Sequence, residues 1–395
     1  MKPVMDEGIR EQQKFSDKPD MDKPHLEQAM QYILQKIDEN LAVFTESFPG
    51  PVSTNNVYSP TDNTDWTTSF WTGMLWLAYE VSGDPKYRKV AEIQIKSFRS
   101  RIENRIGTDT HDLGFLYTLS CMAAYKLTCD VQAKESALMA AELLIGRYYD
   151  KAGIIQAWGD LNDPAQRGRM IIDCLMNLPL LYWASDVTDD KKYRNMAYNH
   201  ARQAAKYIVR EDASCYHTFY MDTQTGEPIG GKTCQGFSDD SSWARGQAWA
   251  IYGFPLSYVY TADESFLEIA FKMANYFLNR LPDDNVCYWD LIFTEGEQER
   301  DSSSAAIAAC GLLELIKHLP QTHLYRTLYQ NAAIKIILSL TDKYTTKESP
   351  DSNGILLHGV YNKPGSCGVD ECCIWGDYFY FEALVRLWKE WKLYW

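Results

Sequence analysis

The sequence has no stretch that could cross a membrane and no surplus of positive charge. None of its 395 residues lies in an apolar run of the roughly 18 residues that a membrane-spanning helix needs. Residues 1–18 are charged throughout and lack the apolar core of a secretory signal. Lys and Arg number 39 against 53 Asp and Glu, a formal net charge of −14, whereas nucleic acids and anionic membranes bind clustered basic residues. We therefore predict no membrane and no nucleic-acid partner, although a local Arg or Lys could still bind a small anion.

Motifs for disulfides, metals and common cofactors are also missing. The 10 cysteines are scattered, with no CxxC pair and no metal-type spacing, a usage typical of reduced thiols in the cytoplasm. The chain contains no GxSxG motif, no P-loop, no dinucleotide-binding glycine motif and no His-rich metal spacing. The sequence thus predicts a cytoplasmic protein without disulfides, whose chemistry uses no cofactor and no metal.

Aromatic residues are what the chain has in excess. It contains 12 Trp and 26 Tyr, more than a core built from Leu and Val would need. Flat apolar rings with a polar edge suit the faces of sugar rings. Large helix packings absorb aromatics too, so composition alone leaves both explanations open.

One local pattern recurs: an apolar helical run, a short polar turn with Gly or Asp, and a second amphipathic run. Its copies span residues 78–95, 125–144, 182–201 and 258–278, with a diverged fifth from 312 to 340. The Asp or Ser at each turn can cap the helix that follows, and the apolar residues after the turn recur at helical spacing. Each copy predicts a helical hairpin whose more apolar first member is the inner helix.

A helix from His25 to about Phe48 and one from Trp375 to Trp391 bring the total to about twelve helices in roughly six hairpins. Repeats that cannot bury their apolar faces alone imply a closed toroid or a solenoid. We expect the first and last helices to pair and close a ring. The predicted fold is all-α, an (α/α)6 barrel with an inner and an outer ring.

The whole barrel is predicted to be one catalytic domain, residues 25–395, after an N-terminal extension of residues 1–24. Residues 214–229 alternate aromatics before a Gly-containing turn, and residues 286–298 look similar. Both segments predict short β-hairpins. In a helical toroid such loops lie at one mouth, where a binding cleft would be.

Two aspartates precede apolar runs that predict inner helices. Asp112 follows His111 in HDLGFLY, and Asp173 is embedded in IIDCLMNLPLLYWA. Asp112 could simply be a helix cap; Asp173 could be a buried cap or an ion pair with Arg169. A carboxyl among so many apolar residues also has its pKa raised by burial, as a proton donor at neutral pH requires. Paired carboxyls on neighbouring inner helices are the usual equipment for glycosidic chemistry.

Arg245 lies where the SSWARGQAWAIYG segment starts a helix. It could form a forked pair with a substrate carboxylate, or it could pair with Asp239 or Asp240. Four further residues are, taken singly, expected to be ordinary packing positions: His217, Trp66, Trp158 and Trp249.

Eight ordered blocks resemble the unsaturated glucuronyl hydrolases of glycoside hydrolase family 88, across residues 25–395. The blocks are NTDWTTSFWTGMLW, HDLGFLYTLS, GIIQAWGD, MIIDCLMNLPLLYWA, YHTFYMD, SSWARGQAWAIYGF, RDSSSAAIAACGLLE and IWGDYFYFEALVR. A lone HDLGF would mean little, whereas this many blocks in order are specific.

The resemblance implies an (α/α)6 barrel and an unusual hydrolysis. The family acts on the C4=C5 double bond that polysaccharide lyases leave on a terminal uronate, as in unsaturated glycosaminoglycan fragments. It implies that Asp173 protonates C4 and helps activate the water that adds at C5, while Asp112 binds substrate and tunes the acid. The sugar-binding set that it implies is Trp66, His111, Trp158, His217, Gln235, Arg245 and Trp249.

The sequence departs from the family in one loop. Streptococcal-type members recognise sulfate through a Ser-x-x-Ser-x-Lys motif before the last helix. Here the loop reads YNKPGSCGVD, with Asn362, Gly365 and Cys367 at the aligned positions and Lys363 and Ser366 out of register. We therefore predict no strong preference for 6-sulfated substrates.

Three alternatives stay open at this point. One is a related hydrolase acting on unsaturated rhamnogalacturonan disaccharides, and another is an ordinary inverting glycosidase acting on saturated uronides. The third is a non-catalytic toroid that binds oligosaccharides. The linkage preference and the oligomeric state are open as well.

Overall fold

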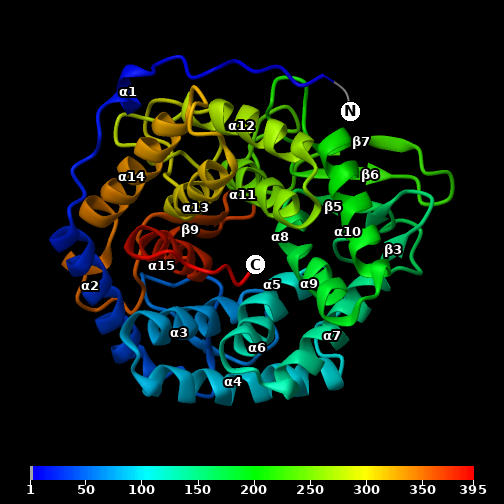
Figure 1. Cartoon of the computed structure of the whole chain (residues 1–395), viewed down its shortest axis with the longest axis horizontal. Coiled ribbons are helices and arrows are strands. Elements are labelled where there is room, and N and C mark those ends of the chain that lie inside the picture. Colours follow the sequence, from blue (N-terminus) through cyan, green and yellow to red (C-terminus); the bar gives the residue numbers. More distant parts are fainter. Residues whose placement is uncertain (1–2) are drawn as a thin grey trace.

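Two concentric rings of helices form the structure, a computed structural model that describes residues 3–395 (Figure 1). The outer ring consists of α2 (Lys23–Leu41), α4 (Pro85–Glu103), α7 (Val131–Ile145), α10 (Lys191–Gln203) with the π-helical turn η2 (Ala204–Ile208), α12 (Glu264–Leu278) and α14 (Arg326–Lys343). The inner ring consists of α3 (Thr68–Ser82), α5 (Leu113–Tyr117) continued by the π-helical turn η1 (Thr118–Met122) and α6 (Ala123–Thr128), α8 (Cys174–Asn177) with α9 (Pro179–Thr188), α11 (Ala244–Thr261), α13 (Ser302–His318) and α15 (Ile374–Trp388). The predicted (α/α)6 barrel is confirmed.

Turn chemistry and burial explain the hairpins. Asp84, Asp130, Asp190 and Asp263 each accept a hydrogen bond from a backbone N–H in the first turn of the following outer helix. The fifth turn differs, because Tyr325 precedes α14 without a side-chain cap. Inner helices such as α11 and α13 are buried on all sides, whereas the outer helix α10 buries only one stripe.

The ring closes where α15 packs against α2 and α3. The prediction for the first helix was wrong at its end: α2 stops at Leu41, and Phe48–Pro49 form strand β1, paired with β2 (Pro60–Thr61). The residue before a proline is disfavoured in helical conformation, which favours the extended backbone of Phe48 in β1. Helix α15 ends three residues before the predicted Trp391.

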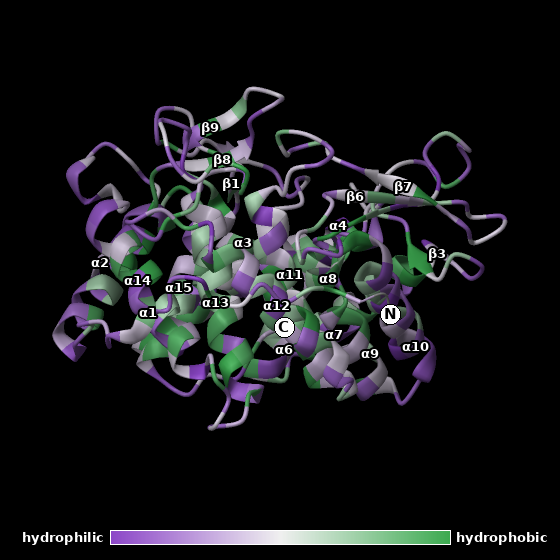
Figure 2. Ribbon diagram, turned by 90° about the horizontal axis from the view of Figure 1, so that it is seen from above, coloured by the Kyte–Doolittle hydropathy of each residue, from purple (hydrophilic) through white to green (hydrophobic). Residues whose placement is uncertain are grey.

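Short strands gather at one end of the barrel (Figure 2). The hairpin predicted at residues 214–229 is confirmed as β6 (Thr218–Met221) and β7 (Pro228–Lys232), joined by β5 (Arg169–Ile171). Two further hairpins were not predicted, β3 (Tyr148–Tyr149) with β4 (Ile154–Ile155) and β8 (Gly359–Asn362) with β9 (Cys367–Glu371). The 3-10 helix η3 (Thr346–Glu348) precedes β8.

The hairpin predicted at residues 286–298 is wrong. The segment forms no strand, only isolated bridges, of Tyr288 with Arg300 and of Asp290 with Trp243. Its backbone pairs instead with the start of α11: the Ala244 N–H donates to the Trp289 carbonyl, and the Leu291 N–H donates to the Ser242 carbonyl.

Residues 3–22, with the short helix α1 (Gln13–Ser16), run along the outside of α12 and α14 (Figure 1). Glu7 pairs with Arg280 at 2.7 Å, and the Asn331 side chain donates to the Phe15 carbonyl at 2.9 Å. The division of the chain at residue 24 stays a prediction, although this segment packs closely on the barrel.

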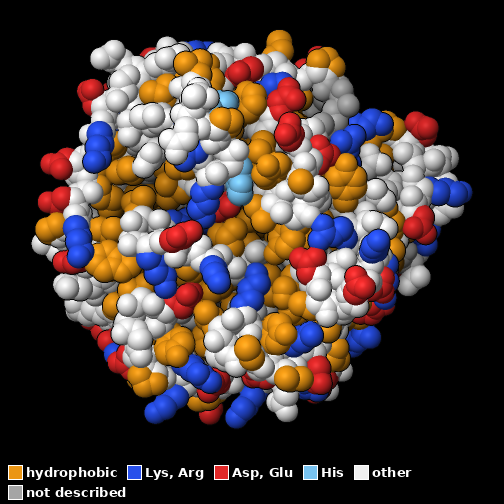
Figure 3. Space-filling model, viewed as in Figure 1, with side chains coloured by type: hydrophobic (Ala, Val, Ile, Leu, Met, Phe, Trp, Pro, Cys, Tyr) orange, Lys and Arg blue, Asp and Glu red, His pale blue; other side chains and the backbone are white. Residues whose placement is uncertain are grey.

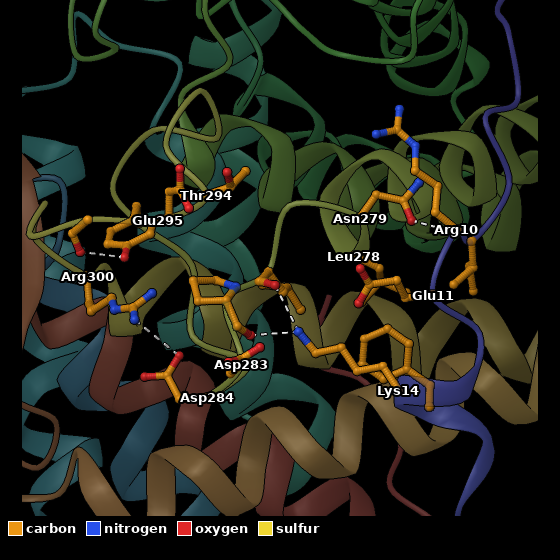
Figure 4. Close-up of a pocket in the computed structure, with 16 residues that line it drawn as sticks. Arg10, Glu11, Lys14, Leu278, Asn279, Asp283, Asp284, Thr294, Glu295 and Arg300 are labelled. Atoms are coloured by element: carbon orange, nitrogen blue, oxygen red, sulfur yellow. Dashed lines mark hydrogen bonds and ion pairs between the residues drawn. The ribbon is translucent and has the colours of Figure 1, made fainter.

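A cavity of about 730 Å³ lies between this N-terminal segment and residues 278–300 (Figure 4). Its basic groups already have protein partners. Lys14 donates to the carbonyls of Leu281 and Pro282, and Arg300 pairs with Asp284 at 3.5 Å. The cavity is large, but its basic groups are engaged within the protein.

Within residues 3–395, no helix is long and apolar enough to cross a membrane. Basic and acidic side chains are interspersed on the face shown in Figure 3.

Candidate active site

The inner helices all start at the end of the barrel that carries the hairpins, and three of these starts carry the predicted reactive groups. Asp112 directly precedes α5, Asp173 directly precedes α8, and Arg245 is the second residue of α11. Neither aspartate caps its helix with a side-chain hydrogen bond, so the cap explanation of both is wrong. Their carboxyl groups are free to point into the barrel mouth.

A pocket of about 290 Å³ lies among these helix starts and brings all nine predicted site residues together. It is lined by Trp66, His111, Asp112, Trp158, Ile171, Asp173, His217, Cys234, Gln235, Trp243, Arg245, Trp249, Tyr361 and Asn362. The volume is at the small end of the range for small-molecule sites.

The two carboxyl groups meet at the bottom of this pocket with His111 between them. His111 Nε2 is 3.4 Å from Asp112 Oδ1 and 3.3 Å from Asp173 Oδ1. Only 16% of the Asp112 side chain and 19% of the Asp173 side chain are exposed. Asp112 accepts a hydrogen bond from the Thr110 hydroxyl at 2.7 Å, whereas Asp173 Oδ1 is buried without a hydrogen-bond partner.

Burial sets the protonation of this cluster. It raises the pKa of Asp112 to about 6, and it raises the pKa of Asp173 well above its usual range, with the charge of Asp112 adding to the effect. Burial also lowers the pKa of His111 to about 3, so the imidazole is neutral at pH 7. The neutral His111 brings no positive charge that would favour an ionised Asp173. Among Asp112, Asp173 and His111, Asp173 therefore keeps its proton most easily, as a general acid must.

Close packing of two inner helices brings the carboxyl groups together. Gly114 of α5 lies so near α8 that a Cβ atom placed on it would be 2.2 Å from Asn177 Cα. Asn177 accepts a hydrogen bond from the Phe115 N–H at 2.7 Å. The crossing therefore depends on a glycine two residues after Asp112 and on an asparagine four residues after Asp173.

Arg245 is buried and does not pair with Asp239 or Asp240, so that expectation is wrong. Its terminal nitrogens donate to the carbonyl of Val360, to the carbonyl of Tyr361 at 2.7 Å and to Gln235 Oε1 at 3.3 Å. Asp301 lies 3.6 Å away. These contacts fix Gln235 and the β8 strand at the pocket wall, and they leave few donors of Arg245 for a substrate.

The three predicted sugar-binding tryptophans differ in exposure. Trp249 is 1% exposed and packs between Phe115 and Phe379, so it forms part of the floor. Trp158 is 42% exposed and offers an open ring face at the mouth. Trp66 is partly buried and donates from Nε1 to the Tyr361 hydroxyl at 3.2 Å.

His217 is buried beside Trp243, and its Nδ1 lies 2.6 Å from the Thr218 hydroxyl. Burial lowers the pKa of His217 to about 3, so the ring is neutral at pH 7. A neutral imidazole can offer a hydrogen bond to a sugar hydroxyl without competing for the proton of Asp173.

The chain is 47% identical to an unsaturated chondroitin disaccharide hydrolase of Streptococcus pneumoniae, with full coverage of both chains. The family model described as Glycosyl Hydrolase Family 88 matches residues 23–387. The chain belongs to glycoside hydrolase family 88. The resemblance and the prediction of a glycoside hydrolase are thereby confirmed.

Solved structures of family 88 agree with this assignment. The crystal structure of unsaturated glucuronyl hydrolase from Streptococcus agalactiae has a TM-score of 0.98 and 48% identity, and it covers 100% of both chains. A variant of that enzyme complexed with dGlcA-GalNAc6S has a TM-score of 0.90 and 45% identity, again with full coverage.

Five residues line the pocket without having been predicted as site residues of this family 88 chain: Ile171, Cys234, Trp243, Tyr361 and Asn362. Ile171 and Trp243 each lie two residues before a predicted one, so proximity in sequence could have found them. Tyr361 could not be found in this way, because it reaches Trp66 from β8 across nearly 300 residues.

The cluster of His111, Asp112 and Asp173 could also hold a metal ion, since one donor atom from each lies within 4.8 Å of the others. The prediction from the sequence was that no metal is used. We expect dialysis against EDTA to leave the rate of hydrolysis unchanged, because the proton donation predicted for Asp173 requires a protonated carboxyl, whereas a metal ligand must be deprotonated. A loss of activity that Zn²⁺ or another divalent ion restores would contradict this expectation.

Proposed function

We propose that the protein releases the Δ4,5-unsaturated uronic acid from the non-reducing end of glycosaminoglycan oligosaccharides that a lyase has produced. The observation that carries the proposal is the pair of mostly buried carboxyl groups, with oxygen atoms within 4.8 Å, set in a pocket that is also lined by the exposed Trp158. Its relatives support the substrate class, being named for unsaturated chondroitin disaccharides and unsaturated glucuronyl groups.

In the proposed reaction Asp173 gives its proton to C4, and the double bond supplies the electron pair for the new C–H bond. The cation at C5 is stabilised by the ring oxygen. Water adds at C5 and gives a proton back to the Asp173 carboxylate, which has become a strong base in its apolar surroundings. The hemiketal then opens to a C5 ketone, and collapse at C1 releases the remaining sugar and leaves an aldehyde.

Asp112 and the neutral His111 hold this reaction centre. Asp112 is fixed by Thr110, and its charge raises the pKa of Asp173. We infer that Asp112 positions the substrate and tunes the acid, as the seven binding residues named from the sequence orient the sugar. The roles of Trp66, Trp158, His217, Gln235, Arg245 and Trp249 belong to this proposal.

An ordinary inverting glycosidase needs carboxyl groups roughly 6.5–9.5 Å apart, with a water molecule between them and the sugar. Oxygen atoms of Asp112 and Asp173 lie closer than that, within 4.8 Å, which disfavours this alternative. Family membership likewise favours an enzyme over a toroid that only binds. The alternative of a hydrolase for unsaturated rhamnogalacturonan disaccharides differs from the proposal only in its substrate, so only a comparison of substrates can decide between them.

The deciding experiment follows the ultraviolet absorbance of the conjugated double bond. Purified protein is given an unsaturated chondroitin disaccharide, an unsaturated rhamnogalacturonan disaccharide and a saturated glucuronide. We expect loss of absorbance with the first substrate and release of its second sugar. Cleavage of the saturated glucuronide alone, or of the rhamnogalacturonan substrate alone, would overturn the proposal.

Sulfation is expected to matter little. Lys363 is the basic residue of the loop whose sequence differs from the sulfate-binding motif of the family, and it forms an ion pair with Glu299. In the same loop, Asn362 accepts a hydrogen bond from the Gly365 N–H at 3.0 Å. The ammonium group is therefore already neutralised. We expect kcat/KM for the 6-sulfated and unsulfated chondroitin disaccharides to agree within about fivefold, or about 1 kcal/mol. A preference for sulfate of a hundredfold would contradict the prediction.

We also propose a cytoplasmic location, supported by ten cysteines that all lie unpaired. Fractionation of the source cells with an antibody against the chain tests it.

A further inference from the structure

Arg169 makes an unusual contact behind the pocket. Its guanidinium carbon lies 3.6 Å from the centre of the Trp158 ring, a stacked cation–π arrangement. Arg169 does not line the pocket, whereas Trp158 does. The guanidinium therefore packs on the Trp158 ring without itself lining the pocket, and 42% of the Trp158 surface stays exposed.

The rest of the Arg169 side chain is held in place. Its Nε donates to the Tyr220 hydroxyl at 3.3 Å, and its backbone pairs with Tyr220 between strands β5 and β6. Its carbonyl accepts from the Ala157 N–H at 2.9 Å. Its Nη1 is buried and has no hydrogen-bond partner. The contact with the Trp158 ring is therefore the interaction that stabilises this end of the side chain.

Trp158 needs such support because the residues after it form a loop. Residues 159–168 leave the barrel between Trp158 and β5, and Arg169 is the residue at which the chain returns. On its other side Trp158 pairs with Thr110 in an isolated bridge, and Thr110 binds Asp112. Trp158 is thus linked through its backbone to the segment that holds Asp112, and through its ring to the Arg169 guanidinium.

The depth of the groups in the pocket indicates which sugar Trp158 meets. The two carboxyl groups are at most one-fifth exposed, whereas Trp158 is 42% exposed. The unsaturated uronate must reach the carboxyl groups at the bottom. The sugar beyond the cleaved bond then lies at the mouth, where an aromatic face can stack on it.

We propose that Arg169 is a positioning residue, which fixes the Trp158 ring at the angle that stacks on the sugar beyond the cleaved bond. The inference rests on the proposed function. Because Arg169 acts through Trp158, its loss should weaken the binding of that sugar and leave the chemical step at Asp173 intact.

The test compares two substrates in the wild type and in Arg169→Met, which keeps an unbranched apolar stem but removes the charge and the planar group. The first substrate is the unsaturated chondroitin disaccharide. The second is the methyl glycoside of the unsaturated uronate, which lacks the second sugar that Trp158 is proposed to contact. We expect KM for the disaccharide to rise about five- to tenfold with kcat within about twofold. KM for the methyl glycoside should stay within about twofold.

Four further variants make the result specific. Arg169→Lys keeps a cation over the ring and should restore part of the disaccharide KM. In a Trp158→Ala background, Arg169→Met should have no further effect, because the two residues act as one unit. The matched control is Arg280→Met, since Arg280 stacks 3.2 Å over Tyr276 on the outer helix α12 and should leave both KM values unchanged.

Equal effects of Arg169→Met on the two substrates, or a fall in kcat without a change in KM, would overturn the inference. So would additive effects with Trp158→Ala. If the wild type consumes neither unsaturated substrate, the proposed function itself fails, a result distinct from both of these.

Discussion

Replacing Asp173 by Asn is expected to lower kcat on the unsaturated disaccharide by about a thousandfold, within the range that general acid–base catalysis contributes. The amide keeps the shape of the side chain but has no acidic proton for C4 and no carboxylate to take a proton from water. KM should change little, because the variant removes an interaction needed only in the transition state. The measurement is steady-state loss of ultraviolet absorbance at saturating substrate.

The same variant should be at least as stable as the wild type at neutral pH. Burial raises the pKa of Asp173 in the folded protein, so the folded state binds the proton more tightly than the unfolded state does. Such a group destabilises the fold increasingly as pH rises above its pKa in the unfolded chain. Removing it removes that cost, and an unchanged or higher melting temperature would show that lost activity is not lost folding.

Asp112→Asn is the matched control for the division of roles. Its amide can still bind Thr110, but the charge that raises the pKa of Asp173 is gone. We expect kcat to fall by about ten- to a hundredfold, less than for Asp173→Asn. The reverse order would exchange the roles of the two aspartates.

The parts of the fold and of the site that could be predicted from the sequence are those that depend on residues close together in the chain. The hairpin repeats and the capping aspartates, such as Asp84 and Asp190, are local patterns, and they predicted the barrel. Asp173 stood out because a carboxyl among apolar neighbours is costly unless it has a partner or a use.

The predictions failed where distant segments decide the structure. Arg245 binds the carbonyls of Val360 and Tyr361, more than 110 residues away, and nothing near Arg245 in the sequence indicates this. The segment 286–298 alternates like a hairpin, yet it pairs with the start of α11. That Trp249 lines the pocket while only 1% exposed, with Phe115 and Phe379 packed on it, likewise depends on residues far away in the sequence.

Gly114→Ala should strongly damage both the fold and the site, although it adds only one methyl group. The added Cβ would lie 2.2 Å from Asn177 Cα and 2.4 Å from the Asn177 carbonyl oxygen. Both are backbone atoms of α8, so relief requires the two helices to move apart. We expect a loss of about 3 kcal/mol in the free energy of unfolding, at the upper end of overpacking penalties, measured by urea denaturation.

The activity of Gly114→Ala distinguishes a merely weakened fold from a displaced site. The change separates the helix that follows Asp112 from the helix that follows Asp173, and a shift of about 1 Å in a catalytic site can cost a hundredfold in rate. We therefore expect kcat to fall by about that factor at a temperature where the variant is fully folded. Gly50→Ala is the control, since its Cβ would meet only ordinary contacts at 3.5 Å or more, and both its stability and its kcat should match the wild type. Full activity in folded Gly114→Ala would mean that the spacing of the carboxyl groups tolerates the shift, and the geometric argument for the pair would fail.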